Sequence, residues 1–106
     1  MDRFDYVTIG HVCEDVGENG STLGGPVSFA GLTAQALGCK TAVLTSAATD
    51  FDFATALPNL TVCHIPAAET TTFTNDYTPT GRQQTLHARA AQLTLADLPS
   101  GWEQAD

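Results

Sequence analysis

Residues 24–46 read GGPVSFAGLTAQALGCKTAVLTS, and this stretch indicates the fold more clearly than any other part of the chain. The glycine pair followed by Pro26 predicts the start of a helix, because proline is tolerated in the first helical turn. Apolar residues then recur at helical spacing, and Gly38 stands where a left-handed cap ends a helix. Residues 40–46 continue as an apolar, β-branched run, which predicts a buried strand directly after the helix.

The residues before this stretch predict another strand. Residues 5–9 (DYVTI) are β-branched and aromatic, and Gly10 ends the run. A strand, a helix and a strand in this order indicate a right-handed crossover between two parallel strands. We therefore expect an α/β fold built on a parallel sheet.

The pattern changes after the second of these strands. Three strand candidates follow at 61–65, 70–77 and 82–88, and residues 78–81 (TPTG) predict a hairpin turn between the last two. Polar and apolar residues alternate there, as expected of an antiparallel sheet with one face in water. Residues 98–102 predict a turn before a short helix.

The predicted parallel sheet is too small to stand alone. Parallel sheets are covered on both faces and contain more than two strands. A chain of 106 residues amounts to one domain at most. We therefore expect residues 1–106 to be part of a larger α/β domain, with an antiparallel appendage formed by the later strands.

Composition excludes several classes of partner. Twelve acidic residues against four basic ones give a formal net charge of -8, whereas nucleic acid and anionic membrane surfaces require clustered Lys and Arg. No run approaches the roughly 18 apolar residues of a membrane span, and the first residues lack the pattern of a signal peptide. Cys13, Cys39 and Cys63 are odd in number and contain no close pair, which favours reduced thiols in a cytoplasmic protein.

Two features beside the predicted strands are candidates for ligand binding. Gly24 and Gly25 open a helix, where backbone N–H groups can approach a ligand, and a tight turn without a ligand is the alternative. Asp15 follows the first strand and Asp50 follows the second, and ligands of parallel sheets bind at the carboxyl edge of the strands. For Asp50, helix capping or turn formation is the alternative.

The remaining polar candidates are less specific. His11, Cys13 and Asp15 would share one face if the first strand continued, and could then ligate a metal. No second cluster completes such a site, so we expect no metal. Arg82 follows the predicted hairpin turn and is either a ligand contact or a solvated charge. The fingerprints of phosphate loops and of dinucleotide sites do not occur.

Taken together, three stretches resemble the ribokinase-like (PfkB) carbohydrate kinases. They are residues 10–15 (GHVCED), 24–38 (GGPVSFAGLTAQALG) and 41–50 (TAVLTSAATD). The family pattern has a first strand ending in glycine with an Asp five residues later, a double glycine at a helix start, and a glycine-x-Asp after the second core strand. The spacing agrees without gaps from Gly24 to Asp50, and residues 61–88 fit the family's lid. The resemblance therefore spans nearly the whole chain and implies an incomplete ribokinase-like, Rossmann-like fold with a β-lid.

The resemblance also implies which residues bind substrate. Asp15, Gly24 and Gly25 match positions that hold substrate hydroxyls, while Phe29 stands where the family usually has an Asn that contacts a sugar hydroxyl. Ala48 and Gly31 are further departures from the usual pattern. These differences favour a polyol such as an inositol, or a nucleoside, over ribose as the substrate.

The catalytic parts of the family do not match these residues. The family's catalytic Asp, its anion hole and the pocket for ATP, which acts with Mg²⁺, lie in the carboxy-terminal half. We therefore expect the chain to be the substrate-binding part of an ATP-dependent kinase, with no catalytic residue of its own and no turnover when alone.

An alternative from another class is a small non-catalytic module that uses its hairpins to bind a small molecule or a partner. Either way, strand edges without a neighbour invite pairing with another chain. We expect such edges in the lid and beside residues 40–46, and the family's lids suggest a homodimer through this part.

Overall fold

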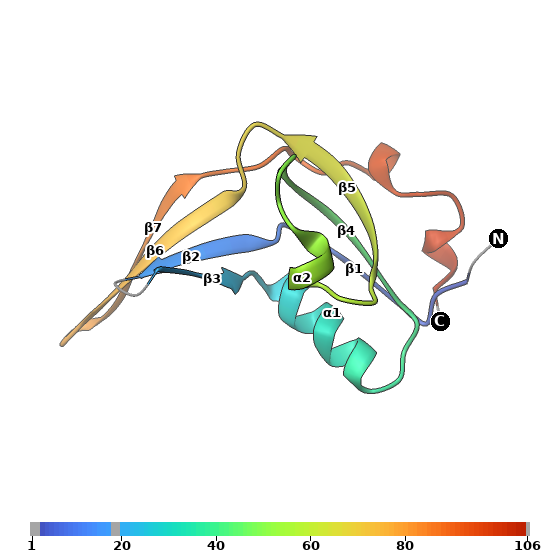
Figure 1. Ribbon diagram of the computed structural model, residues 1–106, viewed down its shortest axis with the longest axis horizontal. Helices are drawn as coiled ribbons and strands as arrows, with labels where there is room; N and C mark the ends of the chain where they lie inside the picture. The colour runs from blue at the N-terminus through green and yellow to red at the C-terminus, as the bar shows by residue number, and fades with distance from the viewer. Residues whose placement is uncertain (1–2, 18–19, 106) are drawn as a thin grey trace.

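The computed structural model describes residues 3–17 and 20–105, which form two β-sheets with helices around one of them (Figure 1). Seven strands occur in the described residues, and they are β1 (Tyr6–Ile9), β2 (Cys13–Gly17), β3 (Gly20–Gly24), β4 (Thr41–Ala48), β5 (Thr61–Ala67), β6 (Thr71–Thr78) and β7 (Gly81–Ala88). The helices are α1 (Pro26–Ala36), α2 (Phe53–Ala56) and the 3₁₀ turns η1 (Leu95–Asp97) and η2 (Trp102–Gln104). The principal extents of 49 × 30 × 24 Å reflect the second sheet, which projects from the first.

The core sheet has the order β1-β4-β5, and both of its pairings are parallel. The central strand β4 is buried from Thr41 to Ala47 because both of its faces are covered. Val43 and Ala47 pack with Val12, Val27 and Leu57 on the side of α1. A second cluster covers the other face and consists of Phe4, Ala42, Leu44 and Trp102. The predicted parallel α/β sheet is confirmed.

Helix α1 begins and ends at the predicted residues. Pro26 occupies the first turn, after Gly25 with φ of 94°, a value that favours glycine. At the other end Gly38 has φ of 92°, and its N–H donates to the carbonyl oxygen of Gln35 at 2.9 Å. The N–H of Cys39 donates to the Ala34 carbonyl oxygen at 3.0 Å, which completes a Schellman cap.

The projecting sheet, called the lid below, has the order β3-β2-β6-β7. Strands β6 and β7 are antiparallel and are joined by a turn in which Thr78 pairs with Gly81, as predicted. Residues 11–23 contain turn residues and no clear periodicity, and the structure forms the hairpin β2–β3 there. Strand β2 also pairs in parallel with β6, so the lid joins two hairpins far apart in the sequence.

The placement of residues 61–65 in the antiparallel appendage was wrong. These residues begin β5, which runs parallel to β4 and extends the core sheet to three strands. Short runs with alternating polarity do not distinguish a lid strand from an edge strand of the core. The expected open edge beside residues 40–46 was also wrong, because β4 is central and the edge strands of the core sheet are β1 and β5.

The shorter helical elements agree in part with the prediction. The expected short helix after residues 98–102 is present as η2, a 3₁₀ turn whose Trp102 packs edge-on against Phe4. Helix α2 was not predicted, because four residues are too few to show periodicity. In the described part of the chain, none of the helices has the length and apolar character needed to cross a membrane.

Buried hydroxyl groups join the lid to the core at the carboxyl end of β4. Thr45 Oγ1 accepts a hydrogen bond of 2.9 Å from the backbone N–H of Val12, which leads into β2. Ser46 Oγ accepts one of 3.1 Å from the N–H of Ala91, which follows β7. Thr70, just before β6, accepts one of 3.0 Å from the N–H of Ala48. Three separate segments that connect the two sheets are therefore hydrogen-bonded to the carboxyl end of β4.

The side chain of His11 makes further hydrogen bonds at this junction. Its Nε2 donates to the Ala91 carbonyl oxygen at 2.7 Å, because a carbonyl can only accept. In the neutral ring Nδ1 is then an acceptor, and it lies 2.8 Å from the hydroxyl of Thr71. Thr71 Oγ1 also accepts from the N–H of Ala90 at 3.0 Å. The connection before β2 is thus tied directly to the connections before β6 and after β7.

We predict that Thr45→Val destabilises the protein by about 1–3 kcal/mol, the cost of leaving the buried N–H of Val12 without an acceptor. Valine has nearly the shape of threonine, so packing is preserved. Urea unfolding followed by circular dichroism measures the loss. Thr33→Val, at an exposed position of α1, is the matched control and should change the stability by less than about 0.5 kcal/mol. Equal losses in the two variants would contradict the role of the Thr45 hydroxyl.

Candidate functional site

The predicted substrate residues Asp15 and Gly24 lie against each other in the lid. They stand on the neighbouring strands β2 and β3, on the same face, since Cys13 pairs with Gly24 and Asp15 with Thr22. A Cβ atom at position 24 would overlap the Asp15 carboxyl group. Glycine at 24 therefore leaves room for the carboxylate in this position.

Gly25 is required for a different close approach. A Cβ atom there would lie 2.6 Å from the carbonyl oxygen of His11 and 3.3 Å from the Cys13 nitrogen. The positive φ of Gly25 adds a conformational reason for glycine at the same place. The glycine pair thus lets the start of α1 approach the chain leading into β2, which brings the helix start beside Asp15.

Asp15 lines a cavity of about 320 Å³ in the lid. Thr22, Asn75 and Tyr77 are its other polar or aromatic walls, and Val16, Gly17 and Gly20 also line it. Among the described residues, none donates a hydrogen bond to the Asp15 carboxylate; the hydroxyl of Thr22 donates only to its backbone carbonyl oxygen. The cavity therefore presents an acceptor with free lone pairs beside amide and hydroxyl groups.

The pKa of the Cys13 thiol depends on its burial and on the charge of Asp15. Burial raises the pKa of this thiol, and the negative charge of Asp15 raises it further. Cys13 is therefore a protonated, buried thiol at neutral pH and a poor nucleophile. The hypothesis that His11, Cys13 and Asp15 ligate a metal gains no support, because no group of three potential metal ligands occurs in the described part of the chain.

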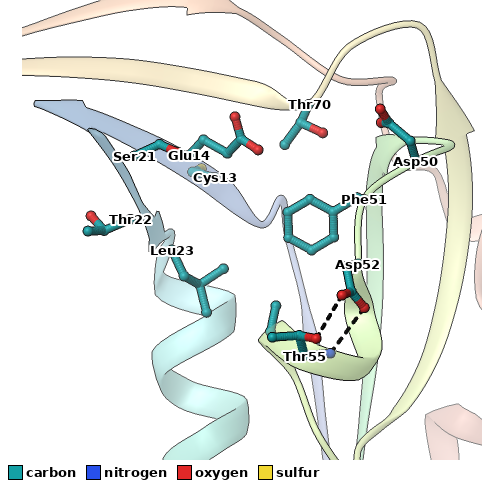
Figure 2. Close-up of a pocket in the computed structure, with 11 residues that line it drawn as sticks. Cys13, Glu14, Ser21, Thr22, Leu23, Asp50, Phe51, Asp52, Thr55 and Thr70 are labelled. Atoms are coloured by element: carbon teal, nitrogen blue, oxygen red, sulfur yellow. Dashed lines mark hydrogen bonds between the residues drawn. The ribbon is translucent and has the colours of Figure 1, made fainter. Parts of the chain in front are cut away.

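Asp50 lines a different cavity, of about 420 Å³, which Figure 2 shows between the β2–β3 hairpin and the segment that leads into α2. Glu14 contributes a second carboxyl group and lies on the opposite face of β2 from Asp15, because side chains alternate along a strand. Phe51 and Leu23 form apolar parts of the wall. The structure therefore places Asp15 and Asp50 in separate cavities.

A third carboxyl group in this cavity, that of Asp52, has a structural partner. Asp52 is the N-cap of α2, and its carboxylate accepts hydrogen bonds from the backbone N–H and the hydroxyl of Thr55 at 3.1 and 2.7 Å (Figure 2). These hydrogen bonds lower the pKa of Asp52. The capping role considered for Asp50 thus belongs to Asp52, and Asp50 lies in the preceding turn.

The other two predicted residues, Phe29 and Arg82, line neither of these cavities. Phe29 is 58% exposed on α1 and lines an apolar groove of about 400 Å³ with Tyr6 and Leu37. Arg82 pairs with Tyr77 near the tip of the β6–β7 hairpin and shares the face of Asp15. The structure therefore brings together Asp15, Gly24 and Gly25, and leaves Phe29, Asp50 and Arg82 in other places.

Sequence reasoning missed Thr22, Asn75 and Tyr77. The spacing of Asn75 and Tyr77 within a predicted strand places them on one face, which was available from the sequence. Their position beside Asp15 depends on the parallel pairing of β2 with β6, which joins segments about sixty residues apart and leaves no local signal.

Comparisons with known proteins define the class of the fold. A pyrophosphate-dependent kinase in the ribokinase family, solved with a pyrophosphate analog and myo-inositol, matches with a TM-score of 0.70 and 28% sequence identity, over 87% of this chain and 35% of that chain. A sulfate complex of a pyrophosphate-dependent kinase in the same family matches with a TM-score of 0.67 and 25% identity, over 87% of this chain and 36% of that one. A microbiome-derived acarbose kinase, at 15% identity and a TM-score of 0.57 over 85% of this chain and 38% of its own, shows the shared fold alone.

No family model and no curated protein matches the sequence. The chain spans about a third of the length of the solved structures that it matches. The structure is nevertheless an incomplete ribokinase-like fold, and the resemblance to ribokinase-family kinases predicted from the sequence is confirmed.

We predict that Gly24→Ala destabilises the protein by up to about 1 kcal/mol, because the new methyl group displaces the Asp15 carboxylate, which is the end of a side chain that can rotate away. Gly17→Ala is the matched control in the same sheet, since a Cβ atom there meets only the Gly20 carbonyl oxygen at 3.9 Å. Chemical unfolding measures both variants. Adding Asp15→Ala should restore part of the loss in Gly24→Ala, and an absence of such coupling would contradict the contact.

Proposed function

We propose that this chain is the substrate-binding part of a kinase that transfers a phosphoryl group to a hydroxyl of a polyol such as an inositol, a sugar or a nucleoside. In this proposal Asp15, Gly24 and Gly25 hold the substrate, and Phe29 borders it only in the assembled enzyme. Cys13, Cys39 and Cys63 are free thiols, in keeping with a cytoplasmic setting.

The observation that carries the proposal is the arrangement around Asp15. A carboxylate accepts hydrogen bonds and can orient two hydroxyl groups, and charge-assisted bonds of this kind are stronger than neutral ones. Among the described residues Asp15 has this capacity free, in a cavity that Thr22, Asn75 and Tyr77 line together with Val16 and two glycines. Such a wall suits a neutral, polyhydroxylated molecule. Myo-inositol, with which a similar kinase was solved, is a molecule of this type.

The fold supplies the remaining requirement, which is a fixed position for the substrate. Gly24 and Gly25 bring the start of α1 against β2, and the hydroxyl groups of Thr45 and Ser46 hold the lid on the core. A substrate on this face of the lid would be oriented by groups that are themselves held in place. Orientation and exclusion of water are the contributions that phosphoryl transfer requires from such a part.

The residues described here do not fit a phosphoryl donor. Lys40 is the single lysine of the chain, and its ammonium group lies 5.2 Å from the centre of the Phe4 ring, on the core rather than near Asp15. No phosphate-loop sequence occurs. In the proposed enzyme ATP with Mg²⁺, or pyrophosphate as in the similar kinases, is therefore held by other parts of the protein, and we derive no catalytic step from this chain.

Asp15→Asn should weaken polyol binding by about tenfold, since losing a charge-assisted acceptor costs at least about 1.4 kcal/mol. The fold should be unchanged, because the amide is nearly isosteric with the carboxylate. Titration of the folded variant with myo-inositol, followed by NMR, measures the affinity. Asp76→Asn, which removes the same charge on the opposite face of the lid, is the control and should bind like the parent. An unchanged affinity in Asp15→Asn would contradict the assignment.

The lid also supports a proposal about assembly. Strands β3 and β7 are its edges, and β7 is exposed from Gly81 to His87 with Arg82 as its only strongly charged residue. An edge with so little charge can pair with the same edge of a second chain. We therefore propose a homodimer through the lid.

Sedimentation at micromolar concentration tests this assembly. Association should strengthen with salt, which screens the repulsion between chains of charge -8. Gln84→Lys in β7 should dissociate the dimer, whereas Gln35→Lys in α1 changes the net charge equally and should not. A monomer at every salt concentration would overturn the dimer.

A further inference from the structure

We propose that His11 is a positioning residue for Asp15, and that protonation of its imidazole ring weakens substrate binding. His11 precedes β2, the strand that carries Asp15, and acts on the substrate only through that residue. This inference rests on the proposed function and adds a control by pH to the same site.

The ring of His11 bridges two segments of the lid. Its Nε2 donates to the carbonyl oxygen of Ala91 at 2.7 Å, and its Nδ1 lies 2.8 Å from the hydroxyl oxygen of Thr71. Thr71 is the first residue of β6, and Ala91 follows β7. The bridge therefore fixes the start of β2 against both connections, and with it the position of Asp15.

The neutral ring satisfies every group in this bridge. Because Nε2 carries the proton, Nδ1 has a free lone pair and accepts from the Thr71 hydroxyl. The Thr71 oxygen in turn accepts from the backbone N–H of Ala90 at 3.0 Å. A protonated ring is a donor at both nitrogens. The hydroxyl hydrogen of Thr71, a residue only 4% exposed, then has no acceptor among the described residues, and a buried donor without an acceptor is costly.

The cavity beside the ring offers no compensation for a positive charge on His11. This cavity has a volume of about 300 Å³, and Arg89 is the charged residue that lines it. The other lining residues are Gly10, Ala90, Gln92 and Leu93. Among the described residues no carboxyl group lines the cavity, so a protonated ring would lie beside a permanent positive charge without a counter-ion.

The strands packed around His11 also contribute few charges. On β2, the protonated thiol of Cys13 donates to the His11 carbonyl oxygen at 3.6 Å. The acidic residues of this strand, Glu14 and Asp15, come after Cys13 and do not line the cavity of the ring. The ends of β4 and β6 contribute the uncharged hydroxyl groups of Thr45, Ser46 and Thr71. Protonation of His11 should therefore loosen the bridge that positions Asp15.

The experiment measures the affinity of the 106-residue chain for myo-inositol by NMR titration at about pH 5.5 and about pH 8, since histidine side chains change charge in this range. The parent chain should bind about threefold more weakly at the lower pH, the effect of weakening one neutral hydrogen bond. His11→Gln should bind like the parent at the higher pH and lose the pH dependence. Its carboxamide offers a donor and an acceptor, as the neutral ring does, but takes up no proton.

Two controls account for the other histidines, because the chain contains three. His87→Gln changes a lid residue whose Nε2 lies 2.8 Å from the hydroxyl oxygen of Thr74. His64→Gln changes a residue of β5 whose Nε2 donates to the carbonyl oxygen of Ala47 at 2.8 Å. Both variants should keep the pH dependence of the parent. A dependence that disappears in either of them and persists in His11→Gln would overturn the inference.

A double-mutant cycle tests whether His11 acts through Asp15. His11→Leu removes both hydrogen bonds of the ring and should weaken binding about fivefold at pH of about 8. Added to Asp15→Asn, it should weaken binding by less than about twofold more, because the residue that it positions has already lost its charge. Fully additive losses would overturn the positioning role. If His11→Leu does not fold, Asp15→Asn alone decides, since its affinity should depend on pH less than that of the parent.

A measurement without ligand separates this inference from the proposed function. At the higher pH, ¹⁵N NMR should place the ring proton of His11 on Nε2. The backbone amide resonance of Asp15 should follow the titration of the His11 ring in the parent and should not titrate in this range in His11→Gln. If that amide does not follow the ring, the inference is overturned while Asp15→Asn still decides the function. If myo-inositol shifts no resonance of the lid at either pH, the function toward cyclitols and the pH effect on binding are both overturned.

Discussion

The hydrogen bonds at the carboxyl end of β4 are the constraint on which the rest of the structure depends. The buried hydroxyl groups of Thr45 and Ser46 accept from backbone N–H groups of segments that lead into or out of the lid. These segments leave one sheet and enter another, so their backbone groups have no strand partner at that point. Side chains on a buried strand supply the missing acceptors, and they thereby set the orientation of one sheet on the other.

This junction explains why the strand after Gly10 can change direction without losing its hydrogen bonds. The N–H of Gly10 still bonds to Leu44 in the core, at 3.1 Å, and the N–H of Val12 bonds to the Thr45 side chain. His11, between them, joins Thr71 and Ala91. Within three residues the chain passes from the core to the lid. Asp15 follows on β2, whose start is fixed by these hydrogen bonds.

The two faces of the lid differ in their chemistry. One face carries Asp15 and Asn75, with a polar cavity that has free hydrogen-bonding capacity. The other carries Glu14 beside Asp50 and Asp52, and there the Asp52 carboxylate is engaged as a helix cap. Because side chains alternate along each strand, a shift of one residue in the β2–β6 register would move Asn75 to the face of Glu14 and bring Asp76 to the face of Asp15. The register between distant segments therefore determines which polar side chains of β6 share a face with Asp15.

Local sequence determined the helix and the strands beside it. Pro26 and Gly38 bound α1 because their backbone preferences act within one turn, and the β-branched runs of β1 and β4 carry a periodicity that needs no distant partner. The double glycine and the spacing to Asp50 were likewise enough to indicate a ribokinase-like fold. Only the tertiary structure decided that residues 61–67 extend the core, that Asp50 and Asp15 line separate cavities, and that Asn75 lines the cavity of Asp15. Each of these depends on strand pairing between residues far apart in the chain, and the free energy of such pairing comes from burial and hydrogen bonds that no local segment contains.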